Sequence, residues 1–430
     1  MKVIVEKPKK INGIIELPGD KSITHRAFLF GSIARGKTVI YNYSKGKDCM
    51  TTLKCIENLG IKVERNEERI IIEGNEYREP EDVLNCENSG TTIRLLSGIL
   101  ASKPFYSVLT GDSSLRQRPM DRIIKPLREM GAEIYGRSND KYPPLTIKGK
   151  KLKGINFKME IPSAQVKSCI IFATIFADGK TEIEEIYQTR DHTERLLKFL
   201  DGNIRKEGTK IILEGNQVLK GKEIYIPGDF SSASYFIAST FLIPGASIII
   251  KKVGLNPTRT GFLNVIERMG GKFKILNQME ISNEPVGDLK VEYTENLKGV
   301  EILPSEVPNI IDEIPIIAIL GCIAKGKTVV SGAKELRVKE SDRIKSITTE
   351  LKKLGADIEE KEDGFIVKGG KKLKGTNVNS WNDHRIAMAL TLASFIAEEK
   401  TIIENSECVD ISFPEFFDKF RELGVNFKFS

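Results

Sequence analysis

One pattern of apolar and polar positions recurs six times along the chain. In each copy a helical stretch ends in an apolar residue followed by glycine, and a β-rich run comes directly afterwards: LKCIENLGIKV, PLREMGAEI, LLKFLDGNI, NVIERMGGKF, ELKKLGADI and KFRELGVNF. The pattern predicts a helix, a stop and a strand in every copy. A glycine just past a helix adopts the left-handed conformation at little cost. We therefore expect six glycines to end these helices: Gly60, Gly131, Gly202, Gly270, Gly355 and Gly424.

Two further elements recur with this one. A small-residue-rich helix with a short turn and a β-rich run appears as FLFGSIARGKTVI, ATIFADGKTEI, ILGCIAKGKTVV and LASFIAEEKTII, and more loosely as ILASKPFYSVL and FLIPGASIII. Two strands joined by a Lys/Gly loop appear as LTIKGKKLKGINFKMEIP, IILEGNQVLKGKEIYIPG and FIVKGGKKLKGTNVNSW. Each repeat therefore has two helices and several strands in about 72 residues, one sixth of the 430-residue chain.

The phase of the repeats predicts the topology. The sixth repeat reaches Ser430 without its strand pair, and the N-terminal stretch KVIVEKPKKINGIIELPG looks like that pair, so we expect the first strands to pack with the last repeat. We predict two similar lobes of three repeats, residues 15–225 and residues 1–14 plus 226–430. Two adjacent chain crossings would form a hinge, with the site in a cleft between the lobes. A solenoid is the alternative, although a 72-residue unit is long for one.

Composition excludes several classes of protein. Hydrophobic residues make up 40% and charged residues 29%, which is wrong for a disordered chain. The longest apolar runs, such as 314–320, are far too short for a membrane span, and the first residues do not resemble a signal peptide. Six cysteines without C-x-x-C argue against a disulfide scaffold or zinc ribbon, and three histidines argue against a multi-histidine metal site. We expect a cytoplasmic protein. Its net charge of +7 suits anionic substrates.

Candidate chemistry lies in the loops that enter the small-residue helices: PGDKSITHR, NSGTTIR, PSAQVKS, PGDFSSA, PNIIDEIP and WNDHRIA. These loops carry helix-capping residues, and a helix N-terminus attracts anions, although capping alone is the alternative role. Cations stand beside four of these caps or in the same loops: Lys21, Arg26, Arg94, Lys167 and Arg385. Further cations lie between helices, in LRQRP and LRVKESDR: Arg116, Arg118, Arg337, Lys339 and Arg343. Pro119 predicts a helix start with Arg118 at its cap. Such cations suggest a substrate with several carboxylate or phosphate groups.

Acidic residues accompany the cations. Asp312 and Glu313 lie in the fifth loop, and Glu340 and Asp342 flank arginines in KESDR. A carboxylate among cations stays ionised and can take a proton from a hydroxyl or return one. A surface salt bridge is the alternative role for Glu340. The chain has neither a G-x-x-x-x-G-K-[ST] nor a G-x-G-x-x-G motif, which argues against a nucleotide P-loop or dinucleotide fold.

Eight stretches in this order resemble the 3-phosphoshikimate 1-carboxyvinyltransferase (EPSP synthase) family: PGDKSITHRAF, NSGTTIRLL, RQRPMDRI, PSAQVKS, RDHTERLL, RVKESDR, NDHRIAMAL and SFPEFF. The resemblance spans residues 18–417. It implies an α/β fold of two lobes, each of three βαβαββ repeats in an inside-out α/β barrel, which closes over its substrates. It implies transfer of the enolpyruvyl group of phosphoenolpyruvate to the 5-hydroxyl of shikimate 3-phosphate. The reaction passes through a tetrahedral intermediate, releases phosphate and needs no metal or organic cofactor.

The resemblance also implies roles for individual residues. Catalysis falls to Asp312, which accepts the 5-hydroxyl proton, and to Glu340 and Lys21, the candidates for proton transfer at the methylene carbon. The implied shikimate 3-phosphate ligands are Lys21, Ser22, Arg26, Ser163, Gln165, Thr189, Asp312 and Lys339, with His192 beside the phosphate. The implied phosphoenolpyruvate ligands are Lys21, Gly90, Arg118, Gln165, Arg343 and Arg385. In this family the inhibitor glyphosate occupies the phosphoenolpyruvate site and extends toward the glycine at position 90.

The chain departs from the family pattern at three positions. Ala164 replaces a serine, Ile411 a lysine and Glu335 an asparagine that relatives carry. The related transferase acting on UDP-N-acetylglucosamine is the nearest alternative, but it carries a reactive cysteine where this chain has Ser113. A nucleic-acid clamp and a non-catalytic anion-binding protein are further alternatives. Acidic residues among the cations would weaken binding to a phosphate backbone, which argues against a nucleic-acid clamp. A protein that only binds anions would not need the carboxylates of Asp312 and Glu340. We expect a monomer without nucleic-acid or membrane partners.

Overall fold

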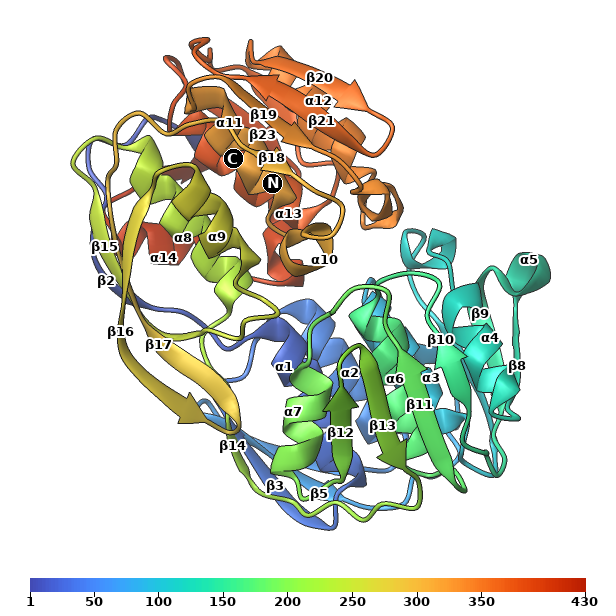
Figure 1. Ribbon diagram of the computed structural model, residues 1–430. Helices are drawn as coiled ribbons and strands as arrows, with labels where there is room; N and C mark the ends of the chain where they lie inside the picture. The colour runs from blue at the N-terminus through green and yellow to red at the C-terminus, as the bar shows by residue number, and fades with distance from the viewer. The chain divides into compact units, whose positions relative to one another are not determined.

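Six four-stranded mixed sheets carry the six repeats in the computed structural model, which describes residues 1–430. In every repeat an edge strand runs parallel to its neighbour, and the remaining pairs are antiparallel, as in the sheet ordered β6-β7-β9-β8. The order along the chain is strand, helix, strand, helix and two strands. The predicted βαβαββ repeat is therefore present six times (Figure 1).

The chain divides into two compact units, each with three of the sheets. Unit 1 comprises Met1–Pro18, Pro227–Glu280 and Pro285–Ser430, and unit 2 comprises Gly19–Ile226 and Ile281–Glu284. Each unit has a hydrophobic core of its own. The chain thus leaves unit 1 after Pro18 and returns to it at Pro227. The hinge and the cleft expected between lobes 15–225 and 1–14 plus 226–430 stay predictions.

Unit 2 contains the first three repeats. The first consists of β14 (Glu223–Tyr225), α1 (Lys21–Ile33), β3 (Gly36–Tyr41), α2 (Lys47–Asn58), β4 (Lys62–Arg65) and β5 (Arg69–Gly74). The second consists of β6 (Leu84–Asn85), α3 (Gly90–Leu100), β7 (Tyr106–Thr110), η1 (Leu115–Gln117), α4 (Asp121–Glu129), β8 (Glu133–Gly136), the short turn α5 (Arg137–Asp140) and β9 (Tyr142–Lys148). The third consists of β10 (Asn156–Lys158), α6 (Ala164–Thr174), β11 (Lys180–Glu184), α7 (His192–Phe199), β12 (Ile204–Glu207) and β13 (Lys210–Glu214).

Unit 1 contains the last three repeats. The fourth consists of β2 (Asn12–Glu16), α8 (Phe230–Leu242), β15 (Ser247–Gly254), α9 (Gly261–Arg268), β16 (Lys272–Ile281) and β17 (Glu284–Glu292). The fifth consists of β18 (Glu301–Ile302), α10 (Val307–Ile310), α11 (Ile314–Ile323), β19 (Lys327–Val330), η2 (Lys334–Val338), α12 (Arg343–Lys353), β20 (Asp357–Lys361) and β21 (Gly364–Lys368). The sixth consists of β22 (Asn377–Asn379), α13 (His384–Ser394), β23 (Thr401–Glu404), η3 (Ser406–Ile411), α14 (Phe416–Glu422), β24 (Phe427–Phe429) and β1 (Lys2–Val5).

The N-terminal strands complete repeats that lie far away in the sequence. Strand β1 pairs with both β23 and β24, which confirms for this strand the prediction that the first strands pack with the last repeat. The prediction is wrong for β2, the second strand of the expected pair, because β2 joins the sheet of the fourth repeat. Strand β2 runs parallel to β15 in the fourth repeat, and β14 runs parallel to β3 in the first. The first and fourth repeats thus each take their edge strand from the segment that precedes a chain crossing.

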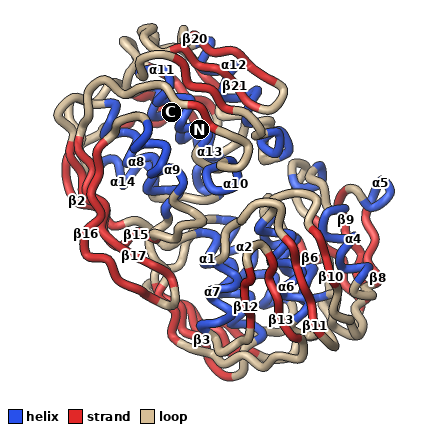
Figure 2. Tube along the Cα trace, in the orientation of Figure 1, coloured by secondary structure: helices blue, strands red, loops and turns tan.

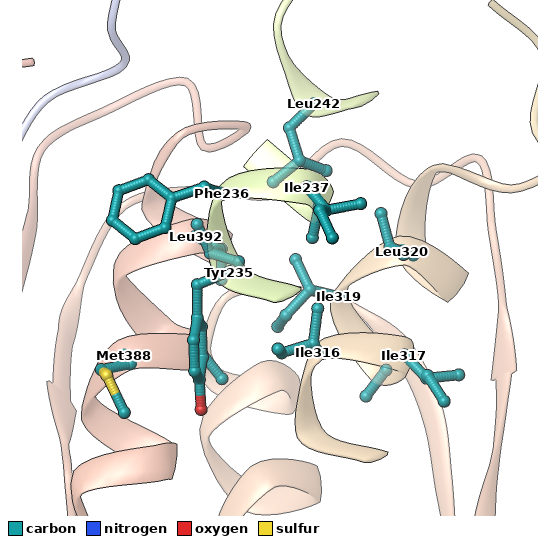
Figure 3. Close-up of a cluster of buried hydrophobic side chains, with 14 of the residues drawn as sticks. Tyr235, Phe236, Ile237, Leu242, Ile316, Ile317, Ile319, Leu320, Met388 and Leu392 are labelled. Carbon is teal, nitrogen blue, oxygen red and sulfur yellow. The ribbon is translucent and has the colours of Figure 1, made fainter. Parts of the chain in front are cut away.

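In each unit the sheets lie on the outside and three helices fill the interior (Figure 2). Helices α1, α3 and α6 are buried along most of their length in unit 2, and α8, α11 and α13 in unit 1. Figure 3 shows side chains of the last three helices meeting in the core of unit 1, among them Ile237, Ile316 and Leu392. A helix that is surrounded by protein on most sides needs mostly small and apolar side chains, which explains the composition of these six helices.

Five of the six predicted helix stops are right and one is displaced. Gly60, Gly131, Gly270, Gly355 and Gly424 have positive φ. The prediction is wrong for Gly202, because Asp201 takes the left-handed position with φ 67°. A Cβ at Gly202 would come within 2.4 Å of Leu197 Cδ1, so this glycine is needed for close packing against α7.

Candidate functional site

The loops before the six interior helices form caps, as expected, with one exception. The side chains of Asp20, Ser89, Ser163, Asp229 and Asp383 accept backbone N–H groups at the starts of α1, α3, α6, α8 and α13. The expectation is wrong for the loop before α11. Its N-cap residue, Glu313, makes no side-chain capping bond, and its fully buried carboxylate accepts a hydrogen bond from Ser231 instead.

Arg26 ties together the first and third repeats of unit 2. Its buried guanidinium donates to Thr193 Oγ1 at 2.6 Å, to Ser168 Oγ at 2.8 Å and to the Ser22 carbonyl at 2.8 Å. Desolvation lowers the pKa of Arg26 to about 10, although the nearby Glu194 carboxylate acts to raise it. Arg26 therefore holds Ser22, another predicted ligand, in a fixed position at the start of α1.

Lys167 is a fully buried cation beneath Thr189. Its ammonium lies 2.7 Å from Glu194 and 3.0 Å from Glu185, and it donates to the Thr189 carbonyl at 3.3 Å. Burial acts to lower the pKa of Lys167, but the two carboxylates outweigh it and raise that pKa. Glu185 also accepts the Thr189 N–H at 3.0 Å and its hydroxyl at 2.5 Å, so this ion-paired group fixes Thr189.

Gly90 opens α3 beside two guanidinium groups. Arg94 donates to Gln165 Oε1 at 2.5 Å and to the Pro119 carbonyl at 3.1 Å, and Arg118 donates to Asn88 Oδ1 at 2.7 Å. A Cβ at Gly90 would lie 3.0 Å from Arg94 Nη1 and 3.2 Å from Arg118 Nη1. The structure thus brings the predicted ligands Gly90, Arg118 and Gln165 together.

One further prediction in unit 2 is wrong, and two further predicted site residues have defined partners. The predicted helix start at Pro119 is wrong, since α4 begins at Asp121 and Arg118 ends the 3-10 helix η1. Lys21, the first residue of α1, pairs with Asp48 at 2.5 Å. His192 lies buried at the start of α7 with its Nδ1 2.8 Å from Glu284 Oε1.

A second cluster surrounds Asp312 in unit 1. The Asp312 carboxylate lies 3.3 Å from Arg385 Nε, 3.4 Å from Arg343 Nη1 and 3.8 Å from Arg259 Nη2. Arg385 also donates to Ser231 Oγ at 2.5 Å. The predicted residues Asp312, Arg343 and Arg385 therefore meet. The positive charges of the two arginines favour the ionised form of the Asp312 carboxylate.

Glu340 and Lys339 complete this cluster. Arg343 donates to Glu340 Oε2 at 2.5 Å and, through Nε, to Asp383 Oδ2 at 2.8 Å. Burial acts to lower the pKa of Arg343, but Asp383, Glu340 and Asp312 outweigh it and raise that pKa. Desolvation lowers the pKa of Lys339 to about 8, against the opposing effect of Asp312. Lys339 is thus the one predicted cation here that can lose its proton near neutral pH.

Two members of the second cluster were not found from the sequence. Arg259 lies in the loop NPTRTG before α9. It stands 11 residues before Gly270, much as Arg118 and Arg343 stand 13 and 12 residues before Gly131 and Gly355, and this repeated cation could have pointed to it. Its buried guanidinium pairs with Glu313 at 3.3 Å as well as with Asp312. Ser231 did stand in one of the six loops, PGDFSSA, but no charge marked it as a partner of Arg385.

The structure locates Ile411 and Ala164, which depart from the family pattern, and Ser113, which replaces the cysteine of the related transferase. Ile411 ends the 3-10 helix η3 and packs against the core of unit 1, so its side chain has an apolar role here. Ala164 is the first residue of α6, directly after the capping Ser163. Ser113 is exposed between β7 and η1, whereas all six cysteines are buried free thiols elsewhere. No helix has both the length and the apolarity that a membrane span requires.

Known proteins match this chain along almost its whole length. The family model described as EPSP synthase (3-phosphoshikimate 1-carboxyvinyltransferase) matches residues 5–420. A 3-phosphoshikimate 1-carboxyvinyltransferase of Petrotoga mobilis is 48% identical, with 98% of this chain and 99% of the relative covered. One from Aquifex aeolicus is 47% identical, with 96% and 97% covered. The solved structure of an EPSP synthase from Acinetobacter baumannii superimposes with a TM-score of 0.88 at 38% identity, with 99% of each chain covered. The fold is therefore the two-lobe α/β fold that the six repeats predicted, and the chain belongs to the EPSP synthase family.

Proposed function

We propose that both clusters serve one reaction, in which phosphoenolpyruvate and shikimate 3-phosphate are the substrates. As a family member the chain is a 3-phosphoshikimate 1-carboxyvinyltransferase of the shikimate pathway, which leads to chorismate and the aromatic amino acids. The observation that carries the assignment of the site is the Asp312 carboxylate between the guanidinium groups of Arg343 and Arg385. An ionised base beside fixed cations suits a reaction between anions that starts at a hydroxyl.

Asp312 is the base of the addition step in this proposal. It accepts the proton of the 5-hydroxyl while that oxygen bonds to C2 of phosphoenolpyruvate, and the methylene carbon C3 gains a proton. In the elimination step C3 returns a proton and the phosphate leaves, so the double bond forms again. Glu340 and Lys21 are the proposed groups for proton transfer at C3. Their neighbours, Arg343 at 2.5 Å and Asp48 at 2.5 Å, hold both side chains in charged hydrogen bonds.

The binding roles follow the two clusters. For phosphoenolpyruvate we propose Lys21, Gly90, Arg118, Gln165, Arg343 and Arg385. For shikimate 3-phosphate we propose Lys21, Ser22, Arg26, Ser163, Gln165, Thr189, Asp312 and Lys339. Guanidinium groups bind carboxylate and phosphate oxygens in pairs, and prepositioned cations stabilise charge that develops on the leaving phosphate. Because the Arg26 guanidinium already serves three protein partners, its proposed contribution includes fixing Ser22 and Ser168.

Phosphate release from phosphoenolpyruvate tests this function. Release should require shikimate 3-phosphate and should not occur with UDP-N-acetylglucosamine in its place. The exposed hydroxyl of Ser113, where the rival transferase has a reactive thiol, supports this choice of acceptor. Release with the sugar nucleotide alone, or release that is independent of shikimate 3-phosphate, would overturn the proposal.

Two general properties complete the proposal. We propose a cytoplasmic protein, because all six cysteines are buried free thiols, the form expected in a reducing compartment. We also propose a monomer, which light scattering would show as a mass of 48.1 kDa. A concentration-independent mass of twice that value would contradict the second statement.

A further inference from the structure

The loop that carries Asp383 into the second cluster has an unusual backbone. It connects β22 to α13, and two successive residues in it, Trp381 with φ 57° and Asn382 with φ 53°, are left-handed without being glycine. Such a conformation costs free energy for an L-residue and persists where the surroundings hold it in place. The loop therefore needs an anchor.

Glu350 on α12 supplies that anchor. Its carboxylate is completely buried, and its Oε1 accepts the indole N–H of Trp381 at 2.9 Å while its Oε2 accepts the backbone N–H of Asn379 at 3.1 Å. Lys353 donates to both oxygens, at 2.9 Å and 2.8 Å, from a half-exposed position. One carboxylate thus holds the start of the loop at two points.

The same helix also holds the end of the loop. Arg343 and Glu350 are seven residues apart, which is about two helical turns and places them on one face of α12. Arg343 binds Asp383 through Nε at 2.8 Å and Nη2 at 3.3 Å. Asp383 in turn accepts the backbone N–H of Arg385 at 2.9 Å. A single face of α12 therefore fixes the backbone from Asn379 to Asp383, the segment that directly precedes Arg385.

We propose that Glu350 is a positioning residue for phosphoenolpyruvate binding, acting through Trp381 and Asn379 on Asp383 and Arg385. This inference rests on the proposed function, because it assigns phosphoenolpyruvate to Arg385. Glu350 itself touches no substrate in this scheme. It keeps the left-handed loop in the one conformation that aims Arg385 at Asp312, 3.3 Å away.

Glu350→Gln separates this role from a general effect on folding. A glutamine has one acceptor oxygen, so its NH₂ group must face either the Trp381 or the Asn379 donor, and one buried N–H is left without an acceptor. We expect the KM for phosphoenolpyruvate to rise about 5–30-fold, the factor that corresponds to about 1–2 kcal/mol, with kcat changed less than about threefold. Lys353→Arg is the matched control, because it alters the neighbour of Glu350 but keeps the positive charge beside this buried carboxylate and both loop contacts, and its KM should stay within about twofold.

Trp381 gives a readout that does not depend on activity, since it is the only tryptophan in the chain. The steady-state fluorescence anisotropy of the free protein should fall in Glu350→Gln, because the indole loses its fixed partner, and should not change in Lys353→Arg. If Glu350→Gln fails to fold, Trp381→Phe, which removes the indole N–H but keeps an aromatic ring, should still raise the KM for phosphoenolpyruvate about 2–5-fold.

Three results would each overturn the positioning role: an unchanged KM in folded Glu350→Gln, an equal rise of the KM in Lys353→Arg, or an unchanged anisotropy in Glu350→Gln. Where Glu350→Gln does not fold, an unchanged KM in Trp381→Phe would overturn it. A wild-type protein without shikimate 3-phosphate-dependent phosphate release would instead refute the proposed function. The anisotropy comparison would in that case still decide whether Glu350 holds the loop.

Discussion

Gly90→Ala places one methyl group between the two guanidinium groups at the start of α3. The new Cβ would lie 3.0 Å from Arg94 Nη1 and 3.2 Å from Arg118 Nη1, so both groups must move by a few tenths of an ångström. They are not free to move without loss, because Arg94 is held by Gln165 at 2.5 Å and Arg118 by Asn88 at 2.7 Å.

The size of the effect follows from these contacts. A hydrogen bond to a charged group contributes about 1.5–3 kcal/mol, and a partial loss of about 1–2 kcal/mol corresponds to a roughly 5–30-fold higher KM for phosphoenolpyruvate. Folding should not suffer, since Gly90 lacks a positive φ and alanine is a better helix former than glycine by about 0.8–1.0 kcal/mol. Glyphosate, which is longer and extends toward this glycine, should lose more affinity than the substrate does.

The assay is a pair of curves, saturation with phosphoenolpyruvate and inhibition by glyphosate, at one fixed shikimate 3-phosphate concentration. Gly254→Ala is the control, because a Cβ there meets its nearest neighbour at an ordinary 3.5 Å, and neither constant should change. The ratio of the two constants decides the outcome, since Ile411 could weaken both ligands from the start. Equal losses for inhibitor and substrate would refute discrimination by size, and no loss for either would refute the contact itself.

Three other changes test separate parts of the structure. Asp312→Asn keeps the shape but removes the base, so kcat should fall by roughly 10²–10⁴ while shikimate 3-phosphate binding changes little, and near-normal turnover would exclude Asp312 as the base. Because the pKa of Lys339 is about 8 and only its charged form attracts an anion, shikimate 3-phosphate affinity should fall as the pH rises through that value. Lys339→Arg should abolish that fall in a binding titration, and a fall that persists in the variant would contradict the assignment. Lys167→Met leaves two buried carboxylates without their cation and should cost about 3–5 kcal/mol in urea denaturation, whereas Lys125→Met at an exposed ion pair should cost less than about 1 kcal/mol. Equal costs in the two lysine variants would contradict a structural role for the buried pair.

The sequence predicted the repeats well because each repeat carries its own local signals. A helix followed by a stop and a strand depends on neighbouring residues, and these signals occur six times in phase. The phase alone indicated that the N-terminal strands complete the last repeat, which holds for β1 but not for β2, since β2 pairs with β15 of the fourth repeat. Gly202 shows the limit of the method, since two candidate residues stood side by side and the aspartate took the left-handed position.

The candidate site was predicted less completely because its charges depend on burial. Arg259 repeats the position of Arg118 and Arg343, but its partners Asp312 and Glu313 come from a loop about 50 residues away. Lys167 was among the candidate cations, but the sequence did not indicate that it is fully buried between two carboxylates. Such pairings arise only when the repeats pack together, so no spacing rule could reveal them.

The exchange of edge strands sets the order in which the chain can fold during synthesis. Nearly all of unit 2 is one continuous stretch, Gly19–Ile226, so it can pair its strands as soon as β14 has been made. Strand β1 must wait for β23, because Lys2 pairs with Glu404. At about 5–20 residues per second this wait lasts roughly 20–80 s, during which β1 is an unpaired strand exposed to other chains, whereas β2 can pair as soon as β15 has been made. The residues that close the fold last are therefore among those translated first, and aggregation of nascent chains should depend on this short N-terminal segment more than on any strand of unit 2.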